Sequence, residues 1–213
     1  MSKAIIGSHN SMSYLEPRDW YGKLLRFAAR CQRKTIKEQY FEYDARCFDF
    51  RIFFDDNGRC FFKHGIVWFD TFSMFEHLEF LNKQGDCWLR VLLEETKSDS
   101  KKHNIDFIEG KFINMCRLIE EIYPNIRVFG GERKWDWKKL YEFKEPMPNI
   151  RDLYSSTTCL FDDTRHGKDD IKDKADDWWP WLYAKLKNKK NMKYIEENPD
   201  NVDIVLIDFV DIR

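Results

Sequence analysis

The sequence lacks the features of several protein classes. None of its apolar runs approaches the ~20 residues of a membrane-spanning helix, so no transmembrane segment is predicted. The first residues carry no apolar leader core, so either the protein stays inside a cell or a leader has been removed. The net charge is −1, and no basic field indicates nucleic-acid binding. Without linkers, repeats or low-complexity stretches, the 213 residues are expected to form one domain, 1–213.

Cysteines are few and scattered, and no Cys-x-x-Cys pair occurs among the six. Cys47, Cys60, Cys87 and Cys159 lie in apolar segments, and we expect buried thiols rather than disulfides because nothing indicates an oxidising compartment. Aromatic residues, in contrast, make up 16% of the chain. Such a content is typical of a heavy core, and part of it can form an apolar rim at a membrane surface.

Strand-like and helix-like segments alternate along the chain. The patterns predict strands at 4–8, 45–54, 59–64, 87–93, 126–129, 157–161 and 202–207, and helices at 20–30, 73–82, 108–122 and 180–197. A hairpin turn is expected at 55–58, a helix stop at Gly85, and the end of a strand at Gly130-Gly131. The alternation indicates a mainly parallel sheet covered on both faces. Because no dinucleotide-binding glycine pattern is present, it favours a small (β/α) barrel over an open sheet.

Polar side chains gather where these strands are expected to end. They are His9, Asp49, Arg51, His64, Glu94, Asp162 and Asp208. In a barrel the carboxyl ends of the strands meet at one mouth, which is where such enzymes place their chemistry. One imidazole that takes a proton, another that gives one, and a guanidinium that neutralises charge are the parts needed to cleave a phosphodiester by internal attack.

Several of these segments resemble a known family. Gly7-Ser8-His9-Asn10-Ser11, the stretch from Cys31-Gln32 to Ala45-Arg46-Cys47-Phe48-Asp49-Phe50-Arg51, Phe62-Lys63-His64-Gly65, and the closing Asn198-Pro199 with Val205 to Val210 occur in this order. Together they are similar to the catalytic domains of phosphatidylinositol-specific phospholipases C, and closer to the bacterial type that works without metal. The resemblance spans most of the chain and implies a small, distorted (β/α)8 TIM-type barrel.

The resemblance also implies roles for four residues. His9 matches the general base that takes the proton from the inositol 2-hydroxyl, and His64 matches the general acid that protonates the departing diacylglycerol oxygen. Arg51 matches the arginine on the non-bridging phosphate oxygens, and Asp208 matches the carboxylate that orients the first histidine. The resemblance implies that the products are diacylglycerol and a cyclic inositol phosphate, as expected of a lyase of lipid metabolism.

The sequence departs from the bacterial pattern in ways that bear on metal use. Asn10 and Glu94 stand where calcium-dependent relatives have ligands, and Asp49 offers a third oxygen. Arg51, however, falls where those relatives have another carboxylate, and a guanidinium beside a divalent cation is costly. We therefore expect no cofactor, with Ca²⁺ held by Asn10, Asp49 and Glu94 as the alternative. Otherwise these three residues and Asp162 are expected to contact substrate.

The remaining expectations concern substrate and partners. Relatives have a longer segment between Phe161 and Trp178, including residues that hold the inositol ring, so the head group is less well supported than the reaction. The partner is expected to be a phospholipid at a membrane interface, met by a peripheral monomer that binds no nucleic acid. The Trp178-Trp179-Pro180-Trp181 cluster either packs the last helix or enters that interface, and Trp20 is a second rim candidate. The alternatives are a calcium-dependent relative acting on another phosphodiester, and a barrel that binds phospholipid without turnover.

Overall fold

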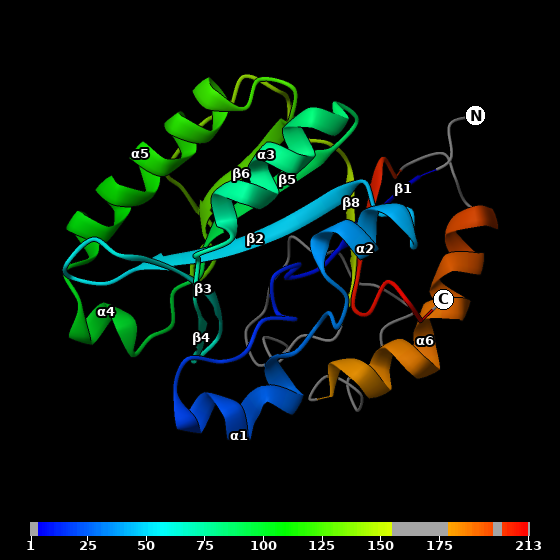
Figure 1. The fold of residues 1–213 in the computed structure, drawn as a ribbon, viewed down its shortest axis with the longest axis horizontal. Helices are drawn as coiled ribbons and strands as arrows, with labels where there is room; N and C mark the ends of the chain where they lie inside the picture. The colour runs from blue at the N-terminus through cyan, green and yellow to red at the C-terminus, as the bar shows by residue number, and fades with distance from the viewer. Residues whose placement is uncertain (1–3, 155–178, 198–201, 213) are drawn as a thin grey trace. The chain divides into compact units, whose positions relative to one another are not determined.

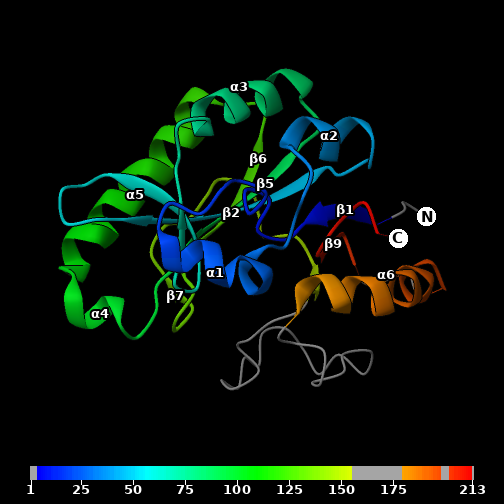
Figure 2. The same cartoon turned by 60° about the horizontal axis from the view of Figure 1, so that its bottom comes forward.

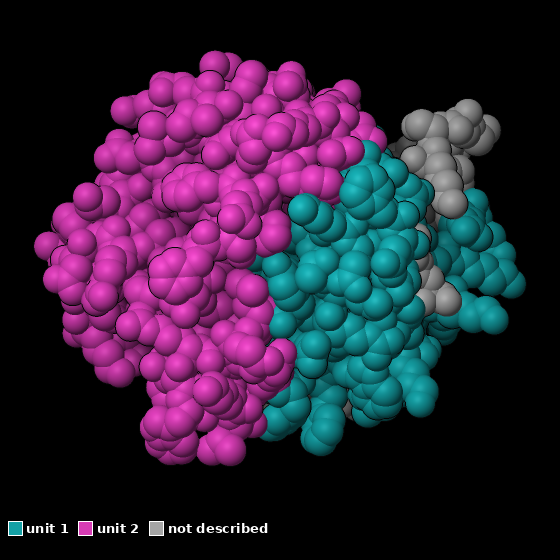
Figure 3. All heavy atoms as spheres, viewed as in Figure 1, with its two compact units in different colours: residues 1–14, 27–47, 148–213 teal, residues 15–26, 48–147 magenta. Residues whose placement is uncertain are grey.

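A computed structural model describes residues 4–154, 179–197 and 202–212. The chain divides into two compact units (Figure 3). Unit 1 comprises Met1–Tyr14, Phe27–Cys47 and Pro148–Arg213, and unit 2 comprises Leu15–Arg26 and Phe48–Met147. Each unit combines strands with helices, which confirms the mixed α/β class expected from the alternating pattern.

The sheet of unit 1 is parallel. Its strands are β1 (Ile5–Ser8), β8 (Ile150–Leu153) and β9 (Ile204–Ile207), in the order β1-β9-β8 (Figure 1). All four residues of β9 are buried, as expected for a strand covered on both faces. The helices of this unit are α2 (Ile36–Phe41) and α6 (Pro180–Glu197). Strands β1 and β9 and helix α6 confirm the sequence prediction.

Gly7 allows the tight packing around β1. A Cβ atom at this position would lie 2.4 Å from Leu206 Cδ2 and 2.9 Å from Cys47 Cβ.

Helix α2 and strand β8 were not predicted. The helix is only six residues long, but Thr35 and Glu38 form a complete capping box at its start. Strand β8 reads Ile-Arg-Asp-Leu, which is too short and too polar to show an alternating pattern.

Unit 2 is built on a second group of strands. They are β2 (Cys47–Phe54), β3 (Cys60–His64), β4 (Val67–Phe69), β5 (Trp88–Leu93), β6 (Arg127–Arg133) and β7 (Lys138–Lys139). The order is β7-β6-β5-β2, with β3 on β2 and β4 on β3. Strands β5 and β6 are parallel, whereas β2, β3 and β4 form an antiparallel meander and β7 folds back on β6. The short strands β4 and β7 were not predicted.

Four helices accompany these strands. They are α1 (Trp20–Ala29), most of which belongs to unit 2, α3 (Met74–Gln84), α4 (Asp99–Lys102) and α5 (Ile105–Ile122). Helices α3 and α5 lie on the same side of β5 and β6 (Figures 1 and 2). They bury part of the apolar stripes that predicted them, for example Leu78 in α3 and Phe112 in α5, whereas Phe75 and Ile122 are exposed. Gly85 ends α3 with a φ of 74°, as expected, whereas Ser73 makes no side-chain cap.

The hairpin between β2 and β3 forms as predicted. Gly58 takes a φ of 76° and donates its N–H to Asp55 O. The Asp55 carboxylate accepts the backbone N–H groups of Asn57 and Arg59, at 3.0 and 2.9 Å. The turn fixes the register that pairs Ile52 with Phe62.

The prediction that Gly130-Gly131 ends a strand is wrong, because β6 continues through both glycines to Arg133. They have φ values of 98° and 69°, and the pairing with β5 shifts between Val91 and Leu92. A Cβ on Gly130 would lie 2.5 Å from Val91 O. The glycines therefore form a bulge inside the strand rather than its end. The strand predicted at 157–161 lies outside the described residues.

The described cysteines are free thiols: Cys31, Cys47, Cys60, Cys87 and Cys116. Cys47 and Cys87 are buried, as expected, whereas Cys60 is partly exposed and Cys159 lies outside the described residues. Burial raises the pKa of the Cys60 thiol to about 12, so this thiol stays protonated. Within the described part of the chain, every helix is too short or too polar to cross a membrane.

Candidate active site

The parallel register of unit 1 brings His9 and Asp208 together. Strand β1 pairs with β9 so that Ser8 lies opposite Ile207. The next residue of each strand is therefore placed at the same sheet edge, and these residues are His9 and Asp208. His9 Nδ1 lies 2.7 Å from Asp208 Oδ1, and both side chains are buried. A carboxylate at this distance fixes the proton on Nδ1 and directs Nε2 away from it.

A tyrosine fixes the plane of the His9 ring. The rings of His9 and Tyr154 are stacked, with their centroids 3.5 Å apart and their planes 2° from parallel. Tyr154 directly follows β8, the other neighbour of β9, and is buried. One face of the imidazole is therefore covered, and the ring can act only through its edge or its other face. The sequence analysis missed Tyr154 because it did not predict β8.

Three amide side chains hold the loops behind this pair. Gln32 donates from Nε2 to the carbonyls of His9 and Ile207, at 3.2 and 2.9 Å, and so connects the ends of β1 and β9. Asn188 of α6 donates to the carbonyl of Asp208 at 2.8 Å. Gln39 of α2 donates to Ser11 O at 3.0 Å. These buried amides satisfy backbone carbonyls at the point where the strands end.

Asn10 follows His9 in a left-handed conformation with a φ of 41°. Asparagine tolerates this region better than most residues, because its short polar side chain bonds to nearby backbone. Its side chain is buried, and so are those of Ser8 and Ser11, whose hydroxyls are bonded to each other. The segment between β1 and residue 14 is thus a tightly built turn beside the His9 ring.

Arg51 lies at the centre of a second cluster of predicted residues, which belongs to unit 2. Its guanidinium donates from Nε to Asp49 Oδ2 at 2.8 Å and from Nη1 to Glu94 Oε2 at 3.4 Å. All three side chains are buried. Asp49 and Arg51 are two residues apart on β2, so they lie on the same face of the sheet. Arg90 of β5 approaches the same carboxylate, with its Nε 4.0 Å from Asp49 Oδ1.

Glu94 connects this cluster to two further groups. Its Oε1 accepts from Lys134 Nζ at 3.1 Å and from the Gly65 N–H at 3.0 Å. Burial opposes ionisation of Glu94, but the charges of Lys134, Arg51 and His64 and the Gly65 N–H hold its pKa at about 2. The pKa of Lys134 is lowered by burial and by Arg51, against the pull of Glu94.

The β2–β3 hairpin places Arg51 and His64. Arg51 lies in the middle of β2, and β3 runs antiparallel to that strand. The pairing of Ile52 with Phe62 brings His64, two residues further on, back alongside the middle of β2. The prediction that these residues lie at the carboxyl ends of strands is therefore wrong for Asp49 and Arg51, whereas His64 is the last residue of β3, as predicted. Glu94, in contrast, directly follows β5, and its N–H donates to Ile52 O.

The neighbours of the predicted residues point away from these clusters, as the strand alternation requires. Arg46 donates to Tyr40 O at 3.0 Å and covers the Tyr40 ring. Lys63 pairs with Asp99, and Glu95 pairs with Arg133. Arg46, Lys63 and Glu95 thus each have partners of their own.

The fold of this chain is similar to that of a bacterial phospholipase C. Two solved structures match it, and both are variants of the phosphatidylinositol-specific phospholipase C from Staphylococcus aureus, one of them with pentafluoro-phenylalanine incorporated. Their TM-scores are 0.54 and 0.53 at 13% sequence identity, and the matches cover 96% of this chain and 84% and 85% of those chains. No protein-family model matches the sequence, and neither does the sequence of any curated protein.

The structure thus forms two groups from the predicted residues. His9 and Asp208, with Asn10 beside them, belong to unit 1, whereas Arg51, Asp49, Glu94 and His64 belong to unit 2. Asp162 lies outside the described residues. Lys134 was missed because the sequence prediction ended β6 at the glycines, four residues too early.

Asp49 and Glu94 do not fit a calcium ion. Each carboxylate is bonded to the Arg51 guanidinium, and Glu94 is also bonded to Lys134. A divalent cation between these oxygens would meet the positive charges of Arg51 and Lys134 at close range. The donor set is therefore that of a buried ion-pair network rather than of an oxygen-ligand cage.

Proposed function

We propose that this protein is a phosphatidylinositol-specific phospholipase C-like phosphodiesterase, a lyase that works without metal. The 2-hydroxyl oxygen of the inositol ring attacks the phosphorus, and the bond from phosphorus to the diacylglycerol oxygen breaks. His9 takes the proton of the attacking hydroxyl, and His64 gives one to the leaving oxygen. The products are diacylglycerol and a cyclic inositol phosphate, and both histidines act on one phosphodiester.

The observation that carries the proposal is the buried contact of His9 with Asp208 at 2.7 Å. A carboxylate that accepts from Nδ1 leaves Nε2 as the basic atom and stabilises the imidazolium that forms when the proton is taken. The contact follows from the register of two parallel strands, so it is built into the sheet rather than into a loop. Internal attack uses a hydroxyl already attached to the substrate, so positioning supplies much of the rate.

Arg51 supports the proposal from the second group of residues. It belongs to a largely buried group of charged side chains that also contains Arg90, Lys134, Asp49 and Glu94. A guanidinium held at Nε and Nη1 by carboxylates has a fixed plane, which suits the forked contact with two phosphate oxygens.

We infer a small, distorted (β/α)8 barrel formed by residues 1–213 as one domain and acting as a monomer. Asn10, Asp49, Glu94 and Asp162 are assigned to substrate contacts. The protein meets its phospholipid at a membrane interface, where exposed aromatic residues enter the lipid. These residues include Trp20, and also Phe27 and Trp179, which are both exposed and whose ring centroids lie 5.4 Å apart.

Phosphorus NMR of the products formed from phosphatidylinositol vesicles tests the reaction. The wild-type protein should give the signal of a cyclic phosphodiester, and His9→Ala and His64→Ala should each lower the rate by at least about 100-fold. His77→Ala is the matched control, because His77 lies on α3 outside both groups of residues and should leave the rate unchanged. If wild type released no more product than the two variants across several head groups, the protein would be a phospholipid-binding barrel.

A chelator separates the metal-free reaction from a calcium-dependent one. Activity of the wild-type protein should persist in EDTA, because the carboxylates that would ligate calcium are bonded to Arg51. Loss of activity in EDTA and its return with added calcium would contradict the metal-free assignment while leaving the phosphodiesterase itself in place.

A further inference from the structure

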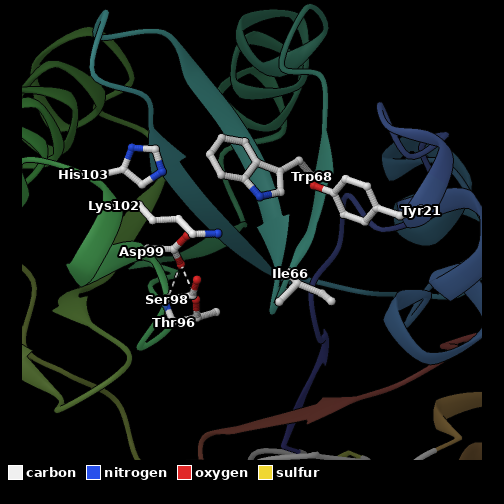
Figure 4. A pocket seen from close by; sticks show the side chains of 8 residues that line it. All are labelled: Tyr21, Ile66, Trp68, Thr96, Ser98, Asp99, Lys102 and His103. Atoms are coloured by element: carbon white, nitrogen blue, oxygen red, sulfur yellow. Dashed lines mark hydrogen bonds between the residues drawn. The ribbon is translucent and has the colours of Figure 1, made fainter.

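A pocket of 320 Å³ lies in unit 2, and its lining shares no residue with the Arg51 cluster (Figure 4). Its wall is formed by Tyr21 of α1 and by Ile66 and Trp68 of the β3–β4 turn and strand β4. Its floor is the segment from Thr96 to His103, which includes helix α4. The volume is at the low end of the about 300–1,000 Å³ that is common for small-molecule sites, so it suits a single ring.

Trp68 is fixed from behind by aromatic residues. Phe53 and Phe61 contact its indole with ring centroids 5.2 and 5.3 Å away. The ammonium of Lys63 lies 5.2 Å from the indole centroid and is buried. The indole is therefore a rigid, partly exposed apolar plate that needs no reordering when a ligand binds.

Asp99 presents one carboxylate oxygen with no hydrogen-bond partner. Its Oδ2 accepts from Lys63 Nζ, from the Thr96 N–H at 2.7 Å and from the Thr96 hydroxyl at 2.6 Å. In the described part of the chain, no side chain or backbone group bonds to Oδ1. Asp99 is more than nine-tenths buried and lines the pocket, so Oδ1 is a fixed acceptor that a ligand hydroxyl can satisfy.

His103 offers a second fixed polar atom. Its Nδ1 is 2.9 Å from Asp56 Oδ2, and this contact leaves Nε2 for the pocket side, as the ring is seen in Figure 4. The backbone N–H of Asn104 bonds to the other oxygen of Asp56 at 3.1 Å, which holds the carboxylate in place. Ser98 and Tyr21 add hydroxyl groups that can both donate and accept.

The charges around the pocket are paired with each other. Lys63 is paired with Asp99, and His103 is held by Asp56. Of the charged residues that line the pocket, Lys102 is exposed and contributes a mobile ammonium at the edge. An anionic ligand would meet the carboxylate of Asp99, and a cationic ligand would meet Lys63 and Lys102. The lining therefore favours a neutral ligand with many hydroxyl groups and one apolar face.

We propose that this pocket binds a neutral sugar, a pyranose whose C–H face lies on Trp68 and whose hydroxyls bond to Asp99 Oδ1 and His103 Nε2. A pyranose hydroxyl both donates and accepts, which matches the mixed lining, and the C–H face of the ring matches the indole. None of its lining residues belongs to the His9 or Arg51 groups, so the proposal can be tested independently of phospholipid cleavage.

Titration of the full-length protein with the methyl glycosides of glucose, galactose and mannose, followed by ¹H–¹⁵N NMR, tests the proposal. The Trp68 indole signal, assigned with Trp68→Phe, should shift saturably with at least one sugar, with a dissociation constant of about 1–10 mM. Trp68→Ala should abolish the saturable shift of the other pocket signals. His103→Ala, a milder change, should weaken binding about 5-fold through one lost hydrogen bond.

Trp88 is the matched control, because its indole packs on Phe129 at the far end of β5 and lines no part of the pocket. Its signal should not move, and Trp88→Phe should bind sugar like the wild type. The proposal is overturned if none of the three sugars gives a saturable shift, or if the shifts persist in Trp68→Ala. It is also overturned if inorganic phosphate or phosphocholine occupies the pocket and displaces the sugar.

Discussion

Replacing Glu94 with glutamine removes the charge that holds the Arg51 cluster together. The pKa of Glu94 is about 2, against an ordinary value of 4.5. At 1.36 kcal/mol per pKa unit, the ionised carboxylate contributes about 3 kcal/mol to the free energy of unfolding at pH 7. Glu94→Gln keeps the shape of the side chain but leaves Arg51 and Lys134 without this partner. We therefore expect a loss of about 3 kcal/mol, which agrees with the cost of breaking a buried ion pair.

The contribution of Glu94 to stability should depend on pH. Because the pKa of Glu94 is lower in the folded state than in the unfolded state, its contribution is fully present above pH 4.5 and is lost as the pH falls toward 2. The stability difference between wild type and Glu94→Gln should therefore shrink from about 3 kcal/mol at pH 7 to about 1 kcal/mol at pH 3. Urea denaturation of both proteins at the two pH values, with equal m-values, measures this difference.

Glu95 supplies the matched control from the next position in the chain. Burial raises its pKa, and the neighbouring carboxylates Asp136 and Asp99 add to the effect against the pull of Arg133. A raised pKa means that ionised Glu95 opposes folding, so Glu95→Gln should leave stability unchanged or increase it at pH 7. Equal losses in the two variants, or a Glu94→Gln difference that does not depend on pH, would refute the reasoning about the Arg51 cluster.

Three further substitutions test other parts of the molecule. Arg51→Lys should lower turnover of phosphatidylinositol by about 100-fold or more, because one ammonium cannot reproduce the fixed fork; near-normal turnover would contradict the assigned role. Asp208→Asn should lower kcat by at least about 100-fold with little change in KM, since it acts through His9; steady-state kinetics on vesicles would show a KM effect instead if it only bound substrate. Gly130→Ala should destabilise by about 2 kcal/mol or more in denaturant melts, because its Cβ would lie 2.5 Å from Val91 O, whereas Gly110→Ala on helix α5 has open space and should stabilise slightly. Equal effects of the two glycine variants would show that the bulge in β6 is not needed.

Local signals were sufficient for much of the fold. The turn at 55–58 was predicted because Asn57-Gly58 has the backbone freedom that a hairpin requires, and Gly85 ended α3 for the same reason. Helix α5 was predicted because its apolar residues recur at helical spacing. In these places short-range chemistry and the final structure agree.

The parts that were missed depend on contacts between distant residues. Gly130 and Gly131 have the composition of a strand end, and only the backbone of β5 beside them makes them a bulge. Lys134 reaches Glu94 because β6 continues past that bulge. Tyr154 stacks on His9 because β8 lies next to β9, which the polar sequence of β8 does not indicate.

The candidate site shows the same division. The contact of His9 with Asp208 was predicted from the resemblance of short motifs, and the register of β1 and β9 confirms it. The 2.8 Å contact of Asp49 with Arg51 follows from their spacing of two residues on β2, which places both side chains on one face of the sheet. The pocket beside Trp68 was not predicted, because its lining comes from three separate segments that share no motif.

The pairing of β1 with β9 has a consequence for how this sequence can vary. Deleting one residue from the run Ile204–Ile207 would leave its hydrophobic composition almost unchanged, so the strand could still form. The deletion would nevertheless move Asp208 by about 3.3 Å along the strand and turn it to the opposite side of the sheet. These two strands should therefore accept conservative substitutions but no insertions or deletions. In distant relatives their lengths should be more constant than the identities of their residues.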